Sequence, residues 1–264
     1  MDNFEWYQYV LVFLIFVWSG FVRSGLGFGG AALSLPFLLL VNNQPLVYLP
    51  IIAIQLLFFS SLTMMVSHRK LSRQQAGGDS NLTSTIDWRY LKYAIAVMII
   101  PKLVGVFGLV VLPNDLMSAI IFVIVGFYAC SYLFSFTFAN NTRWGSTALL
   151  ILGGYMSGTS LIGAPLIIAV VANKVSRSQL RDTLFAIWFI LVAIKLTAFV
   201  YLNVDLQLQQ QLWLLPAAAI GHVLGLRVHA YLLRSDSRRF YRIMGSVLLI
   251  VSVTGCCRNL WQWL

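Results

Sequence analysis

Long apolar stretches, separated by short polar segments, run along almost the whole chain. A helix needs roughly 20 apolar residues to cross the hydrocarbon core of a bilayer. Five stretches meet this requirement throughout, and a sixth meets it with interruptions by glycine, histidine and arginine. The five are residues 46–66, 90–111, 116–138, 180–201 and 240–263, and the sixth is 212–233. The pattern predicts an all-α integral membrane protein whose longest polar loop covers residues 67–87.

Two further apolar regions, 6–41 and 144–173, are too long for one simple span and are broken in the middle by small residues. The first break runs from Ser24 to Gly30, and the second runs from Gly153 to Gly163. Non-helical backbone within a bilayer is tolerated only where protein buries it or water reaches it. We therefore expect each region to form a broken helical hairpin that enters the membrane and returns to the same side.

The composition excludes a soluble enzyme, a disordered chain and a disulfide scaffold. Of 264 residues, 59% are apolar and only 10% are charged, whereas soluble domains carry about 25% charged residues. The formal net charge is +10, which on a soluble protein would suggest a nucleic-acid partner. On a membrane protein it suggests orientation instead, because Lys and Arg collect in cytoplasmic loops. We expect a lipid bilayer and no nucleic acid around this chain.

The cations divide the loops into two groups. Four segments carry Lys or Arg, and we expect them to be cytoplasmic: 67–89, 139–145, 173–182 and 226–242. Four others carry neither, and we expect them to be external: 1–6, 42–46, 112–115 and 202–211. This assignment predicts that both termini are external.

This assignment also predicts two repeats of opposite orientation. Each half, residues 1–139 and residues 140–264, would hold one broken helical hairpin plus three transmembrane helices. Small residues recur at an offset that supports a repeat: Gly20, Ser24, Gly25, Gly30 and Ala31 match Gly153, Ser157, Gly158, Gly163 and Ala164. Hydropathy alone would equally give eight helices in two parallel repeats, and small residues are common in packed membrane helices. The one-sided charge pattern favours inverted repeats.

The breaks predict a binding site for an anion. The pieces after the breaks, about 30–41 and 163–173, are too short to span, so their N-termini should lie deep in the membrane. A helix N-terminus presents free N–H groups and a partial positive charge. Glycine lets the backbone approach a ligand closely, and the candidates for this contact are Gly27, Gly29, Gly30 and Gly163.

Three cations inside the apolar regions agree with an anion site. Arg23 adjoins the first break, and Lys102 and Lys195 lie within 90–111 and 180–201, whereas all acidic residues lie in loops or at span ends. Charged groups at membrane depth are costly and usually functional, so we expect these three to hold the substrate. The alternatives are snorkelling of the lysines to an interface and bracing of the broken backbone by Arg23.

Polar side chains near the breaks could complete the site. We include Ser24, Gln55, Ser157, Thr159 and Ser160 as candidate substrate ligands. The competing interpretation is hydrogen bonding between helices, which we favour for two further serines, Ser60 and Ser61.

Two aromatic residues and three cysteines need separate interpretations. His222 is a candidate for proton coupling or a packing residue, and Trp188 is a candidate wall of the site or only a packing residue. Cys130, Cys256 and Cys257 lack the spacing of metal ligands. With no carboxylate in the spans, we expect no metal, no cofactor and no enzymatic activity.

The Gly-rich breaks resemble those of the sulfite exporter TauE/SafE family. The resemblance rests on Gly25-Leu26-Gly27-Phe28-Gly29-Gly30 followed by Pro36, and on Ser157-Gly158 with Gly163. It implies export of sulfite, thiosulfate-like anions or organosulfonates such as sulfoacetate across a bacterial inner membrane. The second half departs from the pattern, because Ser160 and Ile162 stand where glycines are expected and Pro36 has no counterpart. The substrate could therefore differ from sulfite itself.

Together these observations predict a secondary transporter. It would export a small sulfur-containing anion by alternating access, holding the anion at the membrane midplane between the two broken hairpins. An anion channel and a permease for another small organic or inorganic anion remain alternatives. The oligomeric state stays open, with a homodimer as one arrangement.

Overall fold

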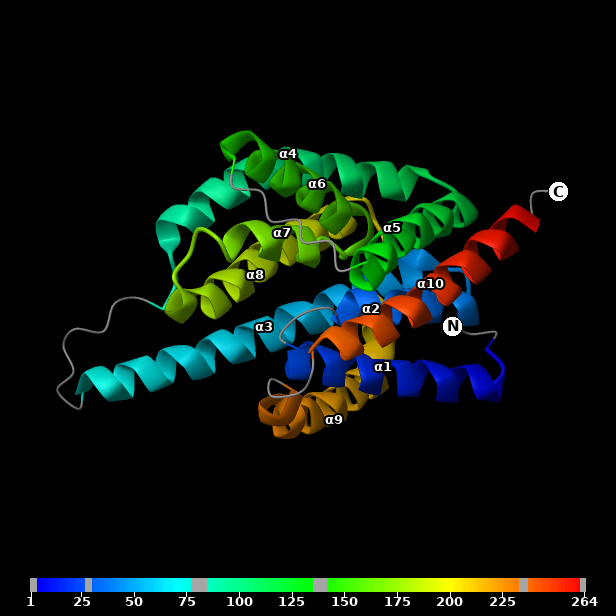
Figure 1. Ribbon diagram of the computed structural model, residues 1–264. Helices are drawn as coiled ribbons and strands as arrows, with labels where there is room; N and C mark the ends of the chain where they lie inside the picture. The colour runs from blue at the N-terminus through cyan, green and yellow to red at the C-terminus, as the bar shows by residue number, and fades with distance from the viewer. Residues whose placement is uncertain (1–3, 27–29, 77–84, 135–141, 233–236, 262–264) are drawn as a thin grey trace.

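The protein folds into a bundle of helices of unequal length. The computed structural model describes residues 4–26, 30–76, 85–134, 142–232 and 237–261. Within these residues there are ten helices and no strand (Figure 1): α1 Trp6–Leu26, α2 Gly30–Val41, α3 Pro45–Ala76, α4 Trp88–Val111, α5 Asn114–Phe134, α6 Arg143–Ser160, α7 Ala164–Val171, α8 Arg177–Tyr201, α9 Leu208–Leu232 and α10 Ser237–Trp261. The prediction of an all-helical chain is confirmed.

The apolar region 6–41 forms two helices that fold back on each other. Helix α1 ends at Leu26 and α2 begins at Gly30. The side-chain amide of Gln8, near the start of α1, donates to the carbonyl of Val41 at the end of α2 over 3.2 Å. The open ends of this hairpin therefore lie together, and its tip carries the first break.

The region 144–173 is likewise divided, into α6 and the eight-residue helix α7. The expected break at 153–163 is wrong over most of its length, because α6 stays helical to Ser160 and only residues 161–163 interrupt it. Leu161 ends α6 in the left-handed conformation, with a φ of 61°, which non-glycine residues seldom adopt. Gly163 then passes so close to α6 that a Cβ there would lie 2.2 Å from the carbonyl oxygen of Gly153. Only glycine fits at this position, so it allows α7 to return along α6.

Two close helix pairs lie at opposite sides of the bundle (Figure 1), α1 with α9 and α4 with α6. Glycines let the backbones approach in both. A Cβ at Gly221 of α9 would lie 1.9 Å from the carbonyl oxygen of Val17 in α1. In the other pair, a Cβ at Gly158 of α6 would lie 2.3 Å from the carbonyl oxygen of Lys102 in α4. Close packing of small residues is the usual basis of helix association in lipid.

Polar contacts gather the loops at two ends of the bundle. At one end, Asn43 donates to a carboxylate oxygen of Asp115 over 2.6 Å. At the other, the backbone N–H of Asp87 donates to the hydroxyl of Thr183 over 3.0 Å. Helix α4 separates the two ends by about 36 Å, at 1.5 Å per residue. The first end holds segments without cations, and the second holds segments rich in Lys and Arg.

Five helices contain segments that are long and apolar enough to cross a membrane, among the described residues. They are Trp6–Gly25, Pro45–Val66, Trp88–Val111, Asn114–Phe134 and Arg177–Tyr201. The expected spans 212–233 and 240–263 are helical, as α9 and α10, but neither is among these five. Both expected spans extend into residues that lie outside the described part of the structure or whose side chains are not described, 228–241, 260 and 262–264.

The expected loop at 67–87 is wrong over its first half, because α3 continues to Ala76. The residues after Val66 include Leu71, Arg73, Gln74, Gln75 and Ala76. These are residue types with high helix propensity, so the helix extends beyond its apolar part. Chain polarity predicted where the apolar span ends, but it did not predict where the helix ends.

Candidate functional site

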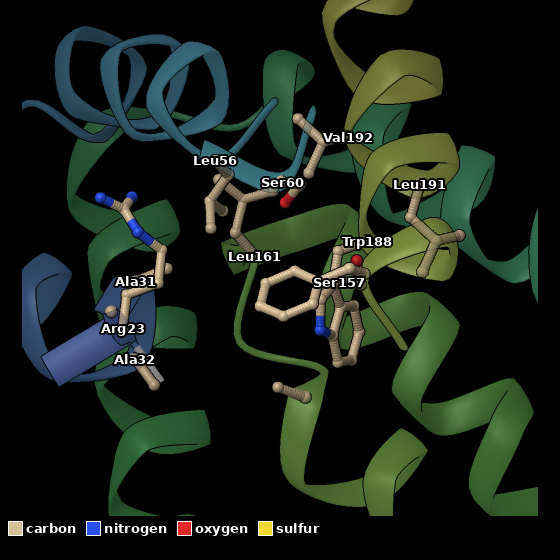
Figure 2. A pocket seen from close by; sticks show the side chains of 13 residues that line it. Arg23, Ala31, Ala32, Leu56, Ser60, Ser157, Leu161, Trp188, Leu191 and Val192 are labelled. Carbon is tan, nitrogen blue, oxygen red and sulfur yellow. The ribbon is translucent and has the colours of Figure 1, made fainter. Parts of the chain in front are cut away.

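A small cavity lies where the two broken hairpins meet (Figure 2). Its volume is about 40 Å³, which is above the roughly 10–15 Å³ that a cavity needs to hold a water molecule. The first hairpin contributes Arg23, Gly30, Ala31 and Ala32, the second contributes Ser157, Leu161 and Ala164, and α3 and α8 contribute Leu56, Ser60, Phe185, Trp188, Leu191 and Val192. Its size is therefore that of a small ion.

Arg23 is the charged residue in the wall of this cavity. Its side chain is 5% exposed, and its guanidinium carbon lies 4.0 Å from the centre of the Phe59 ring. The Nε and Nη2 atoms are buried and have no hydrogen-bond partner among the described residues. Buried polar groups are nearly always paired, and a buried charge without a partner is costly. An anion that reached these two nitrogens would supply the missing acceptor.

The beginnings of both short helices face the same cavity. Gly30, Ala31 and Ala32 form the first turn of α2, and Ala164 is the first residue of α7. The first N–H groups of a helix have no partner within the helix and carry partial positive charge. Pro165 lacks an N–H group, so α7 offers fewer donors than α2. The two hairpins thus bring helix N-termini together as expected, with unequal donor strength.

The two lysines are fully buried, so neither snorkels to an interface. The ammonium of Lys102 donates to the carbonyl and hydroxyl oxygens of Ser157, over 3.3 and 3.0 Å. The ammonium of Lys195 donates to the carbonyls of Gly158 and Thr159, over 2.6 and 3.1 Å. Both therefore neutralise the negative C-terminal end of α6, and neither lines the cavity. The three cations were expected to have no carboxylate partner, and the described partners of the lysines are backbone carbonyls together with the Ser157 hydroxyl. Their contact with substrate stays a prediction.

The remaining predicted ligands fall into different places. Ser157 lines the cavity and bonds to Lys102. The hydroxyls of Thr159 and Ser160 donate to carbonyls of their own helix, including that of Met156. Gln55 is buried, and its amide nitrogen has no partner in the described structure, but it does not line the cavity.

The four predicted glycine contacts have separate outcomes. Gly30 lines the cavity, whereas Gly163 packs against Gly153 and Ser157 of α6. Gly27 and Gly29 lie outside the described residues. The contact of backbone with substrate therefore stays a prediction for all of them.

A second cavity, of about 30 Å³, lies on the other side of Arg23. It is lined by Arg23, Ser24, Phe59, Thr63, Arg181, Phe185, His222 and Leu226. Ser24 and the Nδ1 atom of His222 are joined by a hydrogen bond that links α1 to α9. His222 thus has a hydrogen-bond partner, Ser24, and lines this cavity.

Sequence reasoning assigned two lining residues to other roles. Arg181 was taken only as a cytoplasmic topology signal, and Ser60 was favoured as a packing residue. The spacing of Arg181, Phe185, Trp188 and Val192 places them along one face of α8. That face lines the two cavities, so helical periodicity applied to α8 would have found Arg181.

Comparison with known proteins supplies a family. The model of the family described as sulfite exporter TauE/SafE matches residues 12–254, from within α1 to within α10. The comparison with curated proteins found no match, and neither did the comparison with solved structures.

Proposed function

Because the chain belongs to the sulfite exporter TauE/SafE family, and is therefore a membrane transporter of sulfur-containing anions such as sulfite, we propose that it exports sulfite by alternating access. The cavity between the hairpins has a volume of only about 40 Å³, which suits a small oxyanion better than a larger organic one. Sulfoacetate carries an additional carboxymethyl group and would need a larger space. Sulfite is thus the preferred substrate and sulfoacetate the second.

One observation carries this proposal: the buried, unpartnered guanidinium of Arg23 at a cavity that also receives two helix N-termini. Arg23 offers Nε and Nη2 in a planar fork, which matches the oxygens of an oxyanion. The first turns of α2 and α7 add positive potential. Ser60 and Ser157 provide hydroxyls in the same wall. The charged lining residue is a cation, and the two hydroxyls can donate hydrogen bonds to an anion.

Helix packing supports two inverted repeats as the basis of alternating access. If α1–α5 correspond to α6–α10, the close pair α1 with α9 corresponds to α6 with α4. The same relation exchanges α3 with α8 and α5 with α10, so each of these two pairs maps onto itself. All four pairs pack together, as a two-fold relation requires. In this proposal residues 1–139 and 140–264 are the repeats, and rocking one against the other opens the cavity to each side in turn.

Transport of sulfite by purified protein in liposomes tests the function. We expect saturable uptake of radiolabelled sulfite and exchange of labelled for unlabelled sulfite across the membrane. Sulfoacetate should compete weakly, and neutral solutes or cations should not enter. Saturation with counterflow distinguishes a transporter from an anion channel, which would show neither. Movement of cations or neutral solutes alone would contradict the proposal.

Single cysteines in loops test the inverted topology and the external termini. We expect Asn114→Cys and Asp205→Cys to react with an impermeant reagent from outside, and Ser178→Cys to react only from inside. The three native cysteines are first replaced with serine. Eight helices in parallel repeats would instead put residues 114 and 205 on opposite sides, so that labelling pattern contradicts the proposal.

Two neighbouring serines provide a matched pair for the cavity. The Ser60→Ala variant is expected to raise the KM for sulfite about tenfold, the effect of losing one hydrogen bond to a charged group. Ser61 donates to the carbonyl of Leu57 over 2.8 Å and does not line the cavity, so Ser61→Ala should leave the KM unchanged. Sulfite uptake kinetics in liposomes measure the KM of both variants. If the two variants had the same KM, the Ser60 hydroxyl would not contact the anion.

A further inference from the structure

The second cavity has the residues of an anion site in its own right. It lies between α1, α3, α8 and α9. The cavity between the two hairpins is called the inner cavity, and the two cavities share only Arg23 and Phe185. Five of its lining residues can carry charge or donate hydrogen bonds: Arg23, Arg181, Ser24, His222 and Thr63, whose hydroxyl donates to the carbonyl of Phe59. None of its lining residues is Asp or Glu. Arg23 is thus a lining residue of both cavities.

Two arginines approach this cavity from different depths. Arg23 is almost fully buried, and its Nε and Nη2 atoms have no partner among the described residues. Arg181 is exposed, begins the second turn of α8, and lies with its guanidinium carbon 5.8 Å from the centre of the Phe185 ring. Solvent therefore reaches one arginine directly, and the second lies further along the same cavity.

The hydrogen bond between Ser24 and His222 adds a neutral donor. Where the serine hydroxyl donates to Nδ1, the neutral imidazole carries its proton on Nε2. The His222 ring also lies 4.8 Å from the ring of Phe59, which is the ring that Arg23 covers. Packing on one aromatic side chain keeps these two groups in fixed positions, which lowers the cost of ordering them around a ligand.

We propose that this second cavity is an outer anion site, which takes the same small divalent oxyanion before it reaches the inner cavity. Arg181 attracts the anion from solvent, and Arg23 receives it with Ser24 and His222. Because Arg23 lines both cavities, its side chain passes the anion inward without leaving its charge uncompensated. This inference rests on the proposed function, and it assigns the end of the bundle that carries Arg181 as the side from which substrate is captured.

The test compares Arg181 with a nearby arginine on the same helix. Arg177 is exposed, one turn earlier on α8, and lines neither cavity. Sulfite uptake is measured in proteoliposomes of defined orientation, with sulfite added on the Arg181 side. At an ionic strength of about 0.01 M, where screening is weak, the Arg181→Gln variant should raise the KM about five- to tenfold. Its kcat should not change.

Salt separates a local site from a general surface effect. The difference between wild type and Arg181→Gln should disappear near 1 M salt, where the Debye length is about 3 Å. Arg181→Glu should raise the KM further at low salt, and added salt should lower it. Arg181→Lys should restore most of the affinity, because it restores the charge. Arg177→Gln should behave as wild type.

The outcomes separate this inference from the proposed function. If wild type transports sulfite but Arg181→Gln leaves the KM unchanged, or changes it no more than Arg177→Gln, the outer site is contradicted and the transporter is not. A fall in kcat at constant KM would likewise contradict a capture role. If wild type moves no sulfite at all, the proposed function fails, and the outer site for this anion fails with it.

Discussion

The Arg23→Gln variant is expected to lose transport of sulfite by about 100-fold or more while its helices stay packed. Two hydrogen bonds from a charged donor contribute about 1.5–3 kcal/mol each, and Arg23 has two buried nitrogens without a protein partner. Glutamine removes the charge that the anion compensates. It also removes an uncompensated buried charge in the empty protein, so the unfolding temperature should not fall.

Transport in liposomes and thermal unfolding together measure this effect. Sulfite should raise the unfolding temperature of the wild type, because a ligand that binds only the folded state stabilises it, and it should not do so for Arg23→Gln. Arg23→Lys keeps the charge but loses the planar fork, so it should recover only part of the rate. Transport by Arg23→Gln within threefold of wild type would contradict the role of Arg23 in the site.

The second large effect is expected from Gly221→Ala at the contact between α1 and α9. The new Cβ would lie 1.9 Å from the carbonyl oxygen of Val17 and 2.8 Å from the backbone nitrogen of Phe21. Backbone atoms cannot rotate away, so the helices must separate. Overpacking costs about 1–3 kcal/mol, and here it also displaces the bond between Ser24 and His222. The unfolding temperature should fall clearly, together with transport.

Gly108 provides the control for this substitution. It lies in α4, and a Cβ there would have no atom within 4 Å. Alanine favours a helix by about 1 kcal/mol over glycine, so Gly108→Ala should be neutral or stabilising. The unfolding temperature in detergent, followed by circular dichroism, measures both variants. If the two variants behaved alike, close approach of α1 and α9 would not explain the glycine.

Hydropathy and charge were enough to predict the main elements of the fold. The apolar stretches correspond to helices, and an interruption separates α1 from α2 and α6 from α7. The cation-free segments 42–46 and 112–115 lie together at one end, and the cation-rich segment 67–89 contacts the start of α8 at the other. These features are local, because burying a backbone in lipid requires helices. The end of α3 at Ala76 escaped prediction, because helix propensity continued beyond the apolar part.

The site was predicted only in part, because its chemistry depends on what approaches each side chain from elsewhere in the chain. Arg23 was found from its place beside a break, and it proved to be buried beside a cavity without a partner. Lys102 and Lys195 have the same sequence signature, yet their ammonium groups bind the carbonyls at the end of α6. Position along a span indicates burial but not the partner.

The sequence by itself determined that the chain is a helical membrane protein with two broken hairpins, a one-sided distribution of cations and a family resemblance. Each of these follows from local composition, because lipid, backbone hydrogen bonding and loop charge act on short segments. Only the tertiary structure decided which cation faces a cavity, that Ser60 rather than Gln55 lines it, and that Arg181 joins Arg23 around a second one. Those outcomes require helices far apart in the sequence to pack together, and their glycines set how closely they do so.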